Sequence, residues 1–185
     1  MTQTPRLDLR ALHMSNTGEI PEGLIRWAPK LTDAEKTERF DMALHEAAHF
    51  VAACACPRSM ISNVFIHPTG RTTRAYGGRV HSVEVLEEEE FFVTYAGVAW
   101  EKMRGTNGGK EWRARSDIER AQFSPVSDKP AVEYAACCFM IDNAMVIWAV
   151  AVGFLSYCRT DGNLDGSKLK EIEHWTRGMV SSFVL

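Results

Sequence analysis

Residues 33–55 constrain the fold most, because a helix start signal and a helix stop signal bracket a single apolar stripe. Thr32 and Glu35 form a capping-box sequence, in which each side chain satisfies a backbone N–H of the first helical turn. Pro57 stops the helix, because it lacks the backbone N–H that a helix interior needs. The residues of the stripe recur at helical spacing: Phe40, Leu44, Ala47, Ala48 and Val51. The pattern predicts a long amphipathic helix that packs one face against a core.

The same segment carries the sequence His45-Glu46-Ala47-Ala48-His49. Residues four apart lie on the same helix face, so both imidazoles can reach one tetrahedral zinc ion. Glu46 can lean toward the open position of the metal, accept a proton from water there and return it to a leaving amine. The motif predicts a hydrolytic zinc site with Glu46 as general base. A charged helix face without metal is the alternative.

A hydrolytic zinc site usually has a third protein ligand. Residues 64–69 contain no acid that could serve as a glutamate ligand close to the motif, and residues 50–56 contain neither Gly nor His of the extended metzincin motif. The third ligand is therefore expected from a distant segment. The candidates are His67, His81, Glu84, Glu101 and Asp117.

Three further motifs follow in order along the chain: V-F-I-H-P-T-G at residues 64–70, Y-A-G-V-A-W-E at residues 95–101 and S-D-I-E-R-A-Q at residues 116–122. Together with H-E-A-A-H they resemble the peptidase domain of the FtsH-type membrane AAA proteases, over about residues 41–123. The resemblance implies a zincin-like helical domain, with Asp117 as the third zinc ligand. Glu101 falls on a glutamate of that family that is not usually counted as a ligand.

The resemblance also implies a substrate class, namely unfolded protein segments or short peptides. The ATPase module and the membrane segments of that family have no counterpart in this sequence. We therefore expect a stand-alone peptidase domain that works without ATP.

Residues 61–67 and 75–85 have the β-branched residues and partial alternation of two strands, which predicts a small antiparallel sheet. An extended peptide can add to an exposed sheet edge, so we expect residues 76–85 to hold substrate. An ordinary edge protected by charged side chains is the alternative. The residues predicted to bind substrate are Tyr76, Gly77, Gly78 and Val80. The candidates to polarise the substrate carbonyl are His67, Arg71, Tyr76, Arg79 and His81.

The rest of the chain predicts a mainly α (α+β) fold. Residues 1–30 contain scattered Pro and Gly and are expected to form an irregular arm, followed by a single domain over residues 31–185. Helices are predicted over residues 86–104, from residue 116 to a break at residues 124–125, over residues 131–157 and over residues 167–183.

The formal net charge of −3 is not that of a nucleic-acid-binding protein. The five cysteines have no disulfide-framework spacing, and no signal peptide is visible, so a cytoplasmic location is expected. The most apolar run, residues 144–158, is too short for a membrane span. Assembly into a homo-oligomer is left open.

Three functions fit these residues. The leading one is a zinc metallopeptidase that hydrolyses peptide bonds. The others are a catalytically silent adaptor or regulatory domain with a zincin fold, and a zinc amidohydrolase that acts on a non-peptide substrate.

Overall fold

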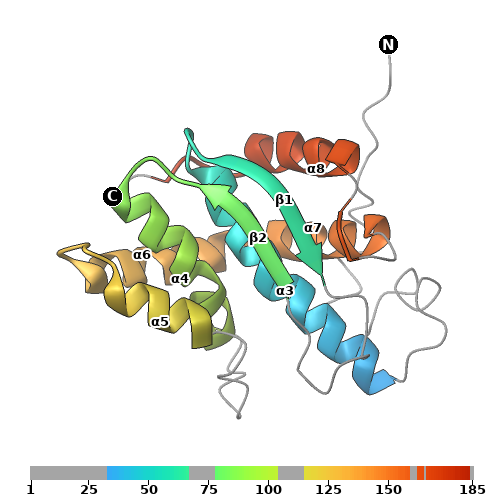
Figure 1. Ribbon diagram of the computed structural model, residues 1–185, viewed down its shortest axis with the longest axis horizontal. Helices are drawn as coiled ribbons and strands as arrows, with labels where there is room; N and C mark the ends of the chain where they lie inside the picture. The colour runs from blue at the N-terminus through green and yellow to red at the C-terminus, as the bar shows by residue number, and fades with distance from the viewer. Residues whose placement is uncertain (1–32, 67–77, 104–114, 159–161, 165, 184–185) are drawn as a thin grey trace.

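The computed structural model describes residues 33–66, 78–103, 115–158, 162–164 and 166–183 (Figure 1). The predicted arm over residues 1–30 lies outside the described residues. The predicted class, mainly α with a small antiparallel sheet, is confirmed. The elements are α3 (Asp33–Ala55), β1 (Met60–Ile66), β2 (Gly78–Val83), α4 (Glu87–Met103), α5 (Arg115–Phe123), α6 (Lys129–Asp142), α7 (Ala144–Tyr157) and α8 (Gly166–Met179).

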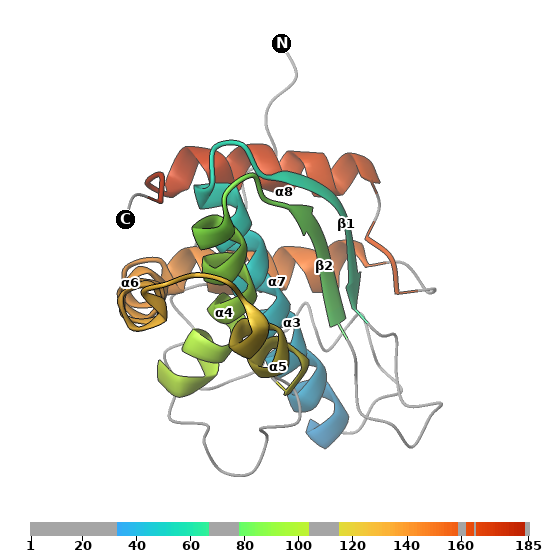
Figure 2. The ribbon, with the colours of Figure 1, turned by 60° about the vertical axis from the view of Figure 1, so that its left-hand side comes forward.

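Helix α3 is the central element, and its predicted bounds are confirmed. It packs against α4, α7, α8 and both strands, and it runs among them in both ribbon views (Figures 1 and 2). Every residue from 41 to 56 is buried, so this half of the helix is enclosed on all sides rather than on one face. Its polar residues therefore need partners inside the protein, because burying an unpaired polar group is costly.

Strands β1 and β2 pair in antiparallel register, with Val64 opposite Val80 and Ile66 opposite Gly78. The outer edge of β1 is covered by residues 162–164: the N–H of Ile66 donates to Gly162 O at 2.8 Å, and the N–H of Leu164 donates to Val64 O at 3.0 Å. Gly162 has φ 91°, a conformation that favours glycine. No described residue pairs with the outer edge of β2, so this edge is the one open to another strand.

The prediction of one helix over residues 131–157 is wrong. The chain forms α6 and α7, which meet at an angle of 74°. Asn143 is the C-cap of α6: its N–H makes the last helical bond to Phe139 O at 3.0 Å, and its side-chain Nδ2 donates to the same oxygen at 2.9 Å. Apolar residues lie on both sides of the break and only Asp142 and Asn143 interrupt them, which is why periodicity alone did not reveal it.

Smaller differences concern the ends of three helices. Helix α5 begins at Arg115, before the predicted start at Ser116, and α6 begins at Lys129 behind an Asp128 side chain that caps it. Helix α8 ends at Met179, because the chain turns back toward the core: Phe183 stacks on Phe92 at 3.7 Å, and its N–H donates to Ala55 O.

The C-terminal end of α3 is held by one side chain from α8. Arg177 donates to the carbonyl oxygens of Cys54 and Cys56 at 3.0 and 3.2 Å and to that of Ser59 at 2.7 Å. Glu173 accepts from the same guanidinium at 3.1 Å. The last carbonyls of a helix have no partner within the helix, so Arg177 supplies donors that α3 lacks.

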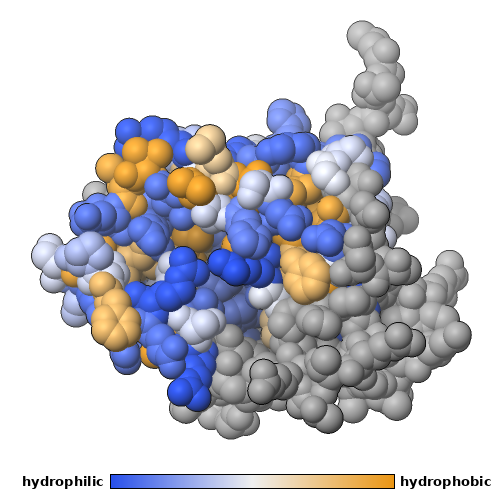
Figure 3. Space-filling model, viewed as in Figure 1, coloured by the Kyte–Doolittle hydropathy of each residue, from blue (hydrophilic) through white to orange (hydrophobic). Residues whose placement is uncertain are grey.

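None of the helices within the described ranges is long and apolar enough to cross a membrane alone. Helices α6 and α7 together have the length and apolar composition of a membrane span, but only as a pair bent by 74°. On the surface, hydrophobic side chains gather at the upper left of Figure 3, over the ends of the strands and the start of α4. The exposed hydrophobic residues of this region are Met60, Val83, Val85 and Leu86.

Candidate metal centre

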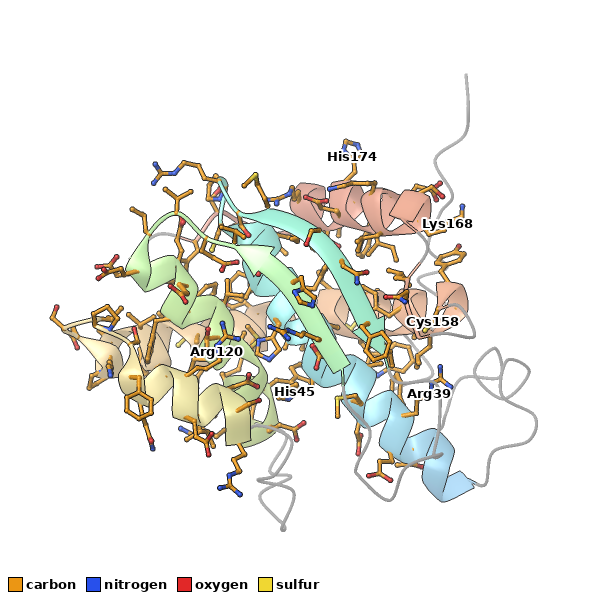
Figure 4. The ribbon with its side chains drawn as sticks, in the orientation of Figure 1. Arg39, His45, Arg120, Cys158, Lys168 and His174 are labelled. Atoms are coloured by element: carbon orange, nitrogen blue, oxygen red, sulfur yellow. The ribbon has the colours of Figure 1, made fainter. Side chains whose placement is uncertain are left out.

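Helices α3 and α5 bring together the three predicted ligands His45, His49 and Asp117. The Nε2 atoms of the two histidines are 3.2 Å apart, and Asp117 Oδ2 lies 3.1 Å from the first and 3.3 Å from the second. Metal bonds of about 2.0–2.1 Å at the tetrahedral angle place two ligand atoms about 3.3–3.4 Å apart. The three atoms therefore form a triangle of the size that one face of a tetrahedral site requires. Figure 4 shows His45 between α3 and α5.

The orientation of His49 is fixed by helix α4. Its Nδ1 lies 2.7 Å from Val93 O, and a carbonyl oxygen only accepts, so Nδ1 carries the proton and donates it. In the neutral ring this leaves the lone pair on Nε2, which points at the triangle. A backbone carbonyl that accepts from the outer ring nitrogen is the usual way in which a metal-binding imidazole is held in one tautomer.

The other ring, His45, has its Nδ1 buried without a hydrogen-bond partner among the described groups. Glu101 Oε1 lies 3.7 Å from that nitrogen. A shift of about 0.5 Å would turn this ion pair into a hydrogen bond and orient His45 as Val93 orients His49. Glu101 thus faces Nδ1 of His45, whereas Asp117 faces Nε2.

Gly97 of α4 lies against the ligand atoms. A Cβ placed on it would stand 2.5 Å from His49 Nε2 and 2.7 Å from His45 Nε2, closer than non-bonded atoms approach. Helix α4 can come this near only because residue 97 has no side chain. Sequence reasoning missed both Gly97 and the Val93 carbonyl. Gly97 could have been noticed because it lies inside an apolar predicted helix. A glycine there destabilises the helix by about 1 kcal/mol relative to alanine, which suggests that the position has no room for a side chain.

Glu46 is buried between the triangle and strand β2. A Cβ on Gly78 would stand 2.6 Å from Glu46 Oε1, so this glycine makes room for the carboxylate, and the Val80 N–H donates to it. Burial raises the pKa of Glu46, and the nearby His49 and His45 oppose that shift. Glu46 is therefore a buried carboxylate with a raised pKa, beside three side chains that could hold a metal ion, and it can accept a proton there.

The other candidate ligands are placed elsewhere or lie outside the described residues. His81 is exposed on β2, and Glu84 accepts a hydrogen bond from Ser59 Oγ at 3.1 Å. In the described part of the chain, the triangle is the one group of three or more His, Cys, Asp or Glu side chains that could hold a metal ion. The residues that fall outside the description are His67, Arg71, Tyr76 and Gly77.

The charges of the triangle depend on one another. Burial alone lowers the pKa of His45, but the hydrogen bond with Asp117 and the attraction of the nearby Glu101 carboxylate outweigh burial and raise that pKa to about 10. The pKa of His49 is raised too, since its interactions with Asp117 also exceed the effect of burial. Burial raises the pKa of Asp117, but its bonds to the two histidines prevail and hold it well below its usual range. Without metal, a proton therefore occupies the place between these atoms at neutral pH.

Metal binding is expected to release at least one proton per site, because the ion needs the neutral imidazole of His45. Since His45 is protonated below a pKa of about 10, the apparent affinity should rise roughly tenfold per pH unit between pH 6.5 and 8.5. Calorimetric titration with Zn²⁺ in two buffers of different ionisation enthalpy measures the released protons directly. Equal heats in both buffers would contradict this prediction.

No protein-family model, no curated protein and no solved structure matches this chain. A functional conclusion therefore depends on the residues of the triangle and their surroundings. These residues fit a metal ion: the triangle has the required size, one imidazole has a fixed tautomer, and a buried carboxylate stands beside it.

Proposed function

We propose that the chain is a zinc-dependent metallopeptidase of the FtsH-type peptidase class, with His45, His49 and Asp117 as zinc ligands and Glu46 as general base. The observation that carries the proposal is the triangle of 3.1, 3.2 and 3.3 Å with the buried Glu46 next to it. The sequence has no phosphate-binding G-x-x-x-x-G-K-[ST] loop, so hydrolysis by this chain would proceed without ATP.

The donor set supports zinc over the other common hydrolytic ions. Two imidazoles and one carboxylate suit a borderline ion such as Zn²⁺, whereas Mg²⁺ prefers oxygen ligands. Octahedral Mg²⁺ with bonds of about 2.0–2.1 Å would draw adjacent ligand atoms to about 2.9 Å. The three separations of 3.1, 3.2 and 3.3 Å range from near this spacing to the tetrahedral spacing of about 3.3–3.4 Å, so the choice of zinc rests on the donor set.

Zinc held by these three residues would lower the pKa of a bound water molecule to about 7 and would polarise the substrate carbonyl. Glu46 then accepts the proton of the attacking water and donates it to the nitrogen of the departing amine. Its burial keeps bulk water away from this proton, and the Val80 N–H and Gly78 fix the direction of its carboxylate.

The unpaired edge of strand β2 supports an extended peptide as the substrate. The outer edge of β2 has no partner among the described residues, and this strand passes directly beside Glu46. An extended peptide that adds to this edge would lie across the metal centre. Val80 was predicted to bind substrate; its N–H donates to Glu46, so the backbone contacts with a peptide would fall on neighbouring residues of β2. Unfolded segments and short peptides offer such extended backbone.

A cytoplasmic setting fits the cysteines. All five are free, and the thiols of Cys54 and Cys56 are buried with pKa raised to about 12 by burial, so they are unreactive. Free thiols in this number are typical of a reducing compartment.

The test is metal analysis of the purified chain combined with cleavage of a peptide library. We expect one zinc ion per chain, cleavage that a chelator stops and added zinc restores, and reduced zinc content in Asp117→Ala. A protein without metal would favour the silent adaptor function. Stoichiometric zinc without cleavage of any peptide, but with hydrolysis of small amides, would favour the non-peptide amidohydrolase.

A further inference from the structure

Strand β2 leads from the candidate metal centre to an exposed apolar surface. Beside the metal centre, Gly78 and Val80 of this strand adjoin Glu46. At the far end, the chain passes from β2 through residues 84–86 into α4, at the upper left of Figures 1 and 3. The exposed hydrophobic side chains there define the strand-end patch: Met60 (67% exposed), Val83 (60%), Val85 (55%) and Leu86 (46%).

The backbone beneath the strand-end patch is held by several contacts. The first residue of β1 pairs with the last residue of β2. Ser59 Oγ donates to Glu84 Oε1 at 3.1 Å, which ties the start of β1 to the residue after β2. The Leu86 N–H donates at 3.4 Å to Oε2 of Glu89, a buried residue in the first turn of α4. Because the surface is already ordered, a ligand that binds it does not have to immobilise a loop.

A peptide paired with the outer edge of β2 would reach the strand-end patch. An extended chain advances about 3.3 Å per residue, so Val83 and Val85 lie within about 10 and 17 Å of Val80 along the chain. On the exposed face of β2, the side chains of Arg79 and His81 come first and that of Val83 last. Neighbouring strands bring side chains of the same face together. A peptide residue about three to five positions from the one opposite Val80 would therefore contact the patch.

The α4 side of the strand-end patch is negatively charged. No Lys, Arg or His occurs in residues 83–93, and Glu87, Glu88 and Glu90 are exposed. Positive charge lies on the β1 side, where Lys170 of α8 donates to a carbonyl oxygen of β1 at 3.3 Å. A partner that covers the patch therefore gains from basic side chains that face α4.

These charges discriminate between the possible occupants. A symmetric contact between two copies of the chain would bring the same surface against itself, so the exposed glutamates of both copies would repel one another. An anionic membrane surface would be repelled for the same reason. The occupant that fits is a polypeptide segment with apolar side chains for the patch and basic side chains for the glutamates.

We propose that the strand-end patch is a docking surface for a distal part of the peptide substrate, in which apolar and basic side chains alternate. The docked residues lie about three to five positions from the residue opposite Val80. This inference rests on the proposed peptidase function and adds a substrate preference to it. The backbone hydrogen bonds of a sheet edge give affinity without sequence selection, whereas the patch would select among extended peptides by their side chains.

The probes are fluorescein-labelled peptides in which a constant segment, Ala-Ala-Phe-Leu-Ala-Ala, carries a distal block at its amino or its carboxyl end. The block is Leu-Lys-Leu-Lys, Leu-Glu-Leu-Glu or Gly-Ser-Gly-Ser. Binding to the Glu46→Gln chain is measured by fluorescence anisotropy, so that no turnover occurs, and cleavage by the wild-type chain is followed by mass spectrometry. Val85→Ser/Leu86→Ser removes apolar side chains of the patch. Its control is Ile141→Ser/Met145→Ser, at residues that are 61% and 58% exposed on α6 and α7.

The charges are tested by Glu87→Gln/Glu88→Gln. The control with the same change in net charge is Asp142→Asn/Glu171→Gln, at exposed residues of α6 and α8. Each pair of substitutions is placed in the wild-type chain for cleavage and in the inactive chain for binding.

We expect the Leu-Lys block, at one end of the constant segment, to strengthen binding about tenfold over the Gly-Ser block, the effect of burying about one large apolar side chain. The Leu-Glu block should bind more weakly than the Leu-Lys block, and added salt should reduce that difference. Val85→Ser/Leu86→Ser should abolish the gain, and Glu87→Gln/Glu88→Gln should remove the difference between the charged blocks. Zinc content and both controls should be unchanged.

Binding that depends on the block and on these residues, but without cleavage of any peptide, would support the docking surface and contradict the peptidase function. The docking surface would be overturned by cleavage that is independent of the block, by a block effect that survives both patch variants, or by failure of every peptide to bind. It would also be overturned if Val85→Ser/Leu86→Ser converted a wild-type dimer to a monomer in analytical ultracentrifugation, or abolished binding of the wild type to phosphatidylglycerol vesicles.

Discussion

The Glu46→Gln chain is expected to keep its zinc and to lose peptide hydrolysis by a factor of about 10²–10⁴, the usual contribution of a general base. The amide has nearly the shape of the carboxylate, so it still fills the space beside Gly78 and still accepts the Val80 N–H. It cannot accept the proton of water. Zinc content and the initial rate of cleavage, measured on the same preparation, separate these two effects.

Glu171→Gln is the control for this variant, because Glu171 is an exposed glutamate on α8 whose described contacts are with Lys168. Its rate should equal that of the wild type. Cleavage by Glu46→Gln at the wild-type rate would show that another group takes the proton. Loss of zinc together with loss of activity would instead place Glu46 among the ligands.

Gly97→Ala is expected to lower zinc affinity by about 10- to 100-fold while all three ligands remain in the sequence. The added methyl group would stand 2.5–2.7 Å from ring atoms of His49 and His45, so one or both rings must move away from the triangle. Neither ring can easily take up another position, since His49 is hydrogen-bonded to Val93 O and both rings are buried. Competition with a chromogenic zinc chelator measures the affinity.

The matched control is Gly178→Ala on α8, where a Cβ would meet nothing within 4 Å. Alanine is the better helix former, so this variant should bind zinc normally and melt at a slightly higher temperature. If Gly97→Ala bound zinc as tightly as Gly178→Ala, the close approach of α4 would not control the metal centre.

The sequence was enough to predict the parts of the site that depend on local geometry. His45 and His49 share a helix face by their spacing alone, and both bounds of α3 followed from its apolar stripe and its flanking signals. Asp117 stands 72 residues from His45, and only the resemblance to a known family singled it out from the other candidates. Its place in the triangle is a property of how α5 packs on α4.

The parts that depend on tertiary packing were not predictable in the same way. The Val93 carbonyl has no side-chain signature, because every residue of a helix has such a group. Gly78 was expected to admit a substrate backbone, but the close neighbour that it admits is Glu46. The break at Asn143 lies between two apolar runs that suit one helix or two, and tertiary packing distinguishes them, since α6 packs on α4 and α7 packs on α3.

The contacts of Arg177 bear on the order in which the chain can fold. The three carbonyls that it satisfies precede it by 118 to 123 residues, so the end of α3 lacks these donors until the last helix has docked. Contacts of such long sequence separation slow folding, because a large loop must close before they form. The helix that carries both histidines should therefore become rigid late, in one cooperative step with α8. A chain emerging from the ribosome would then form a rigid candidate metal centre only after α8 has been made.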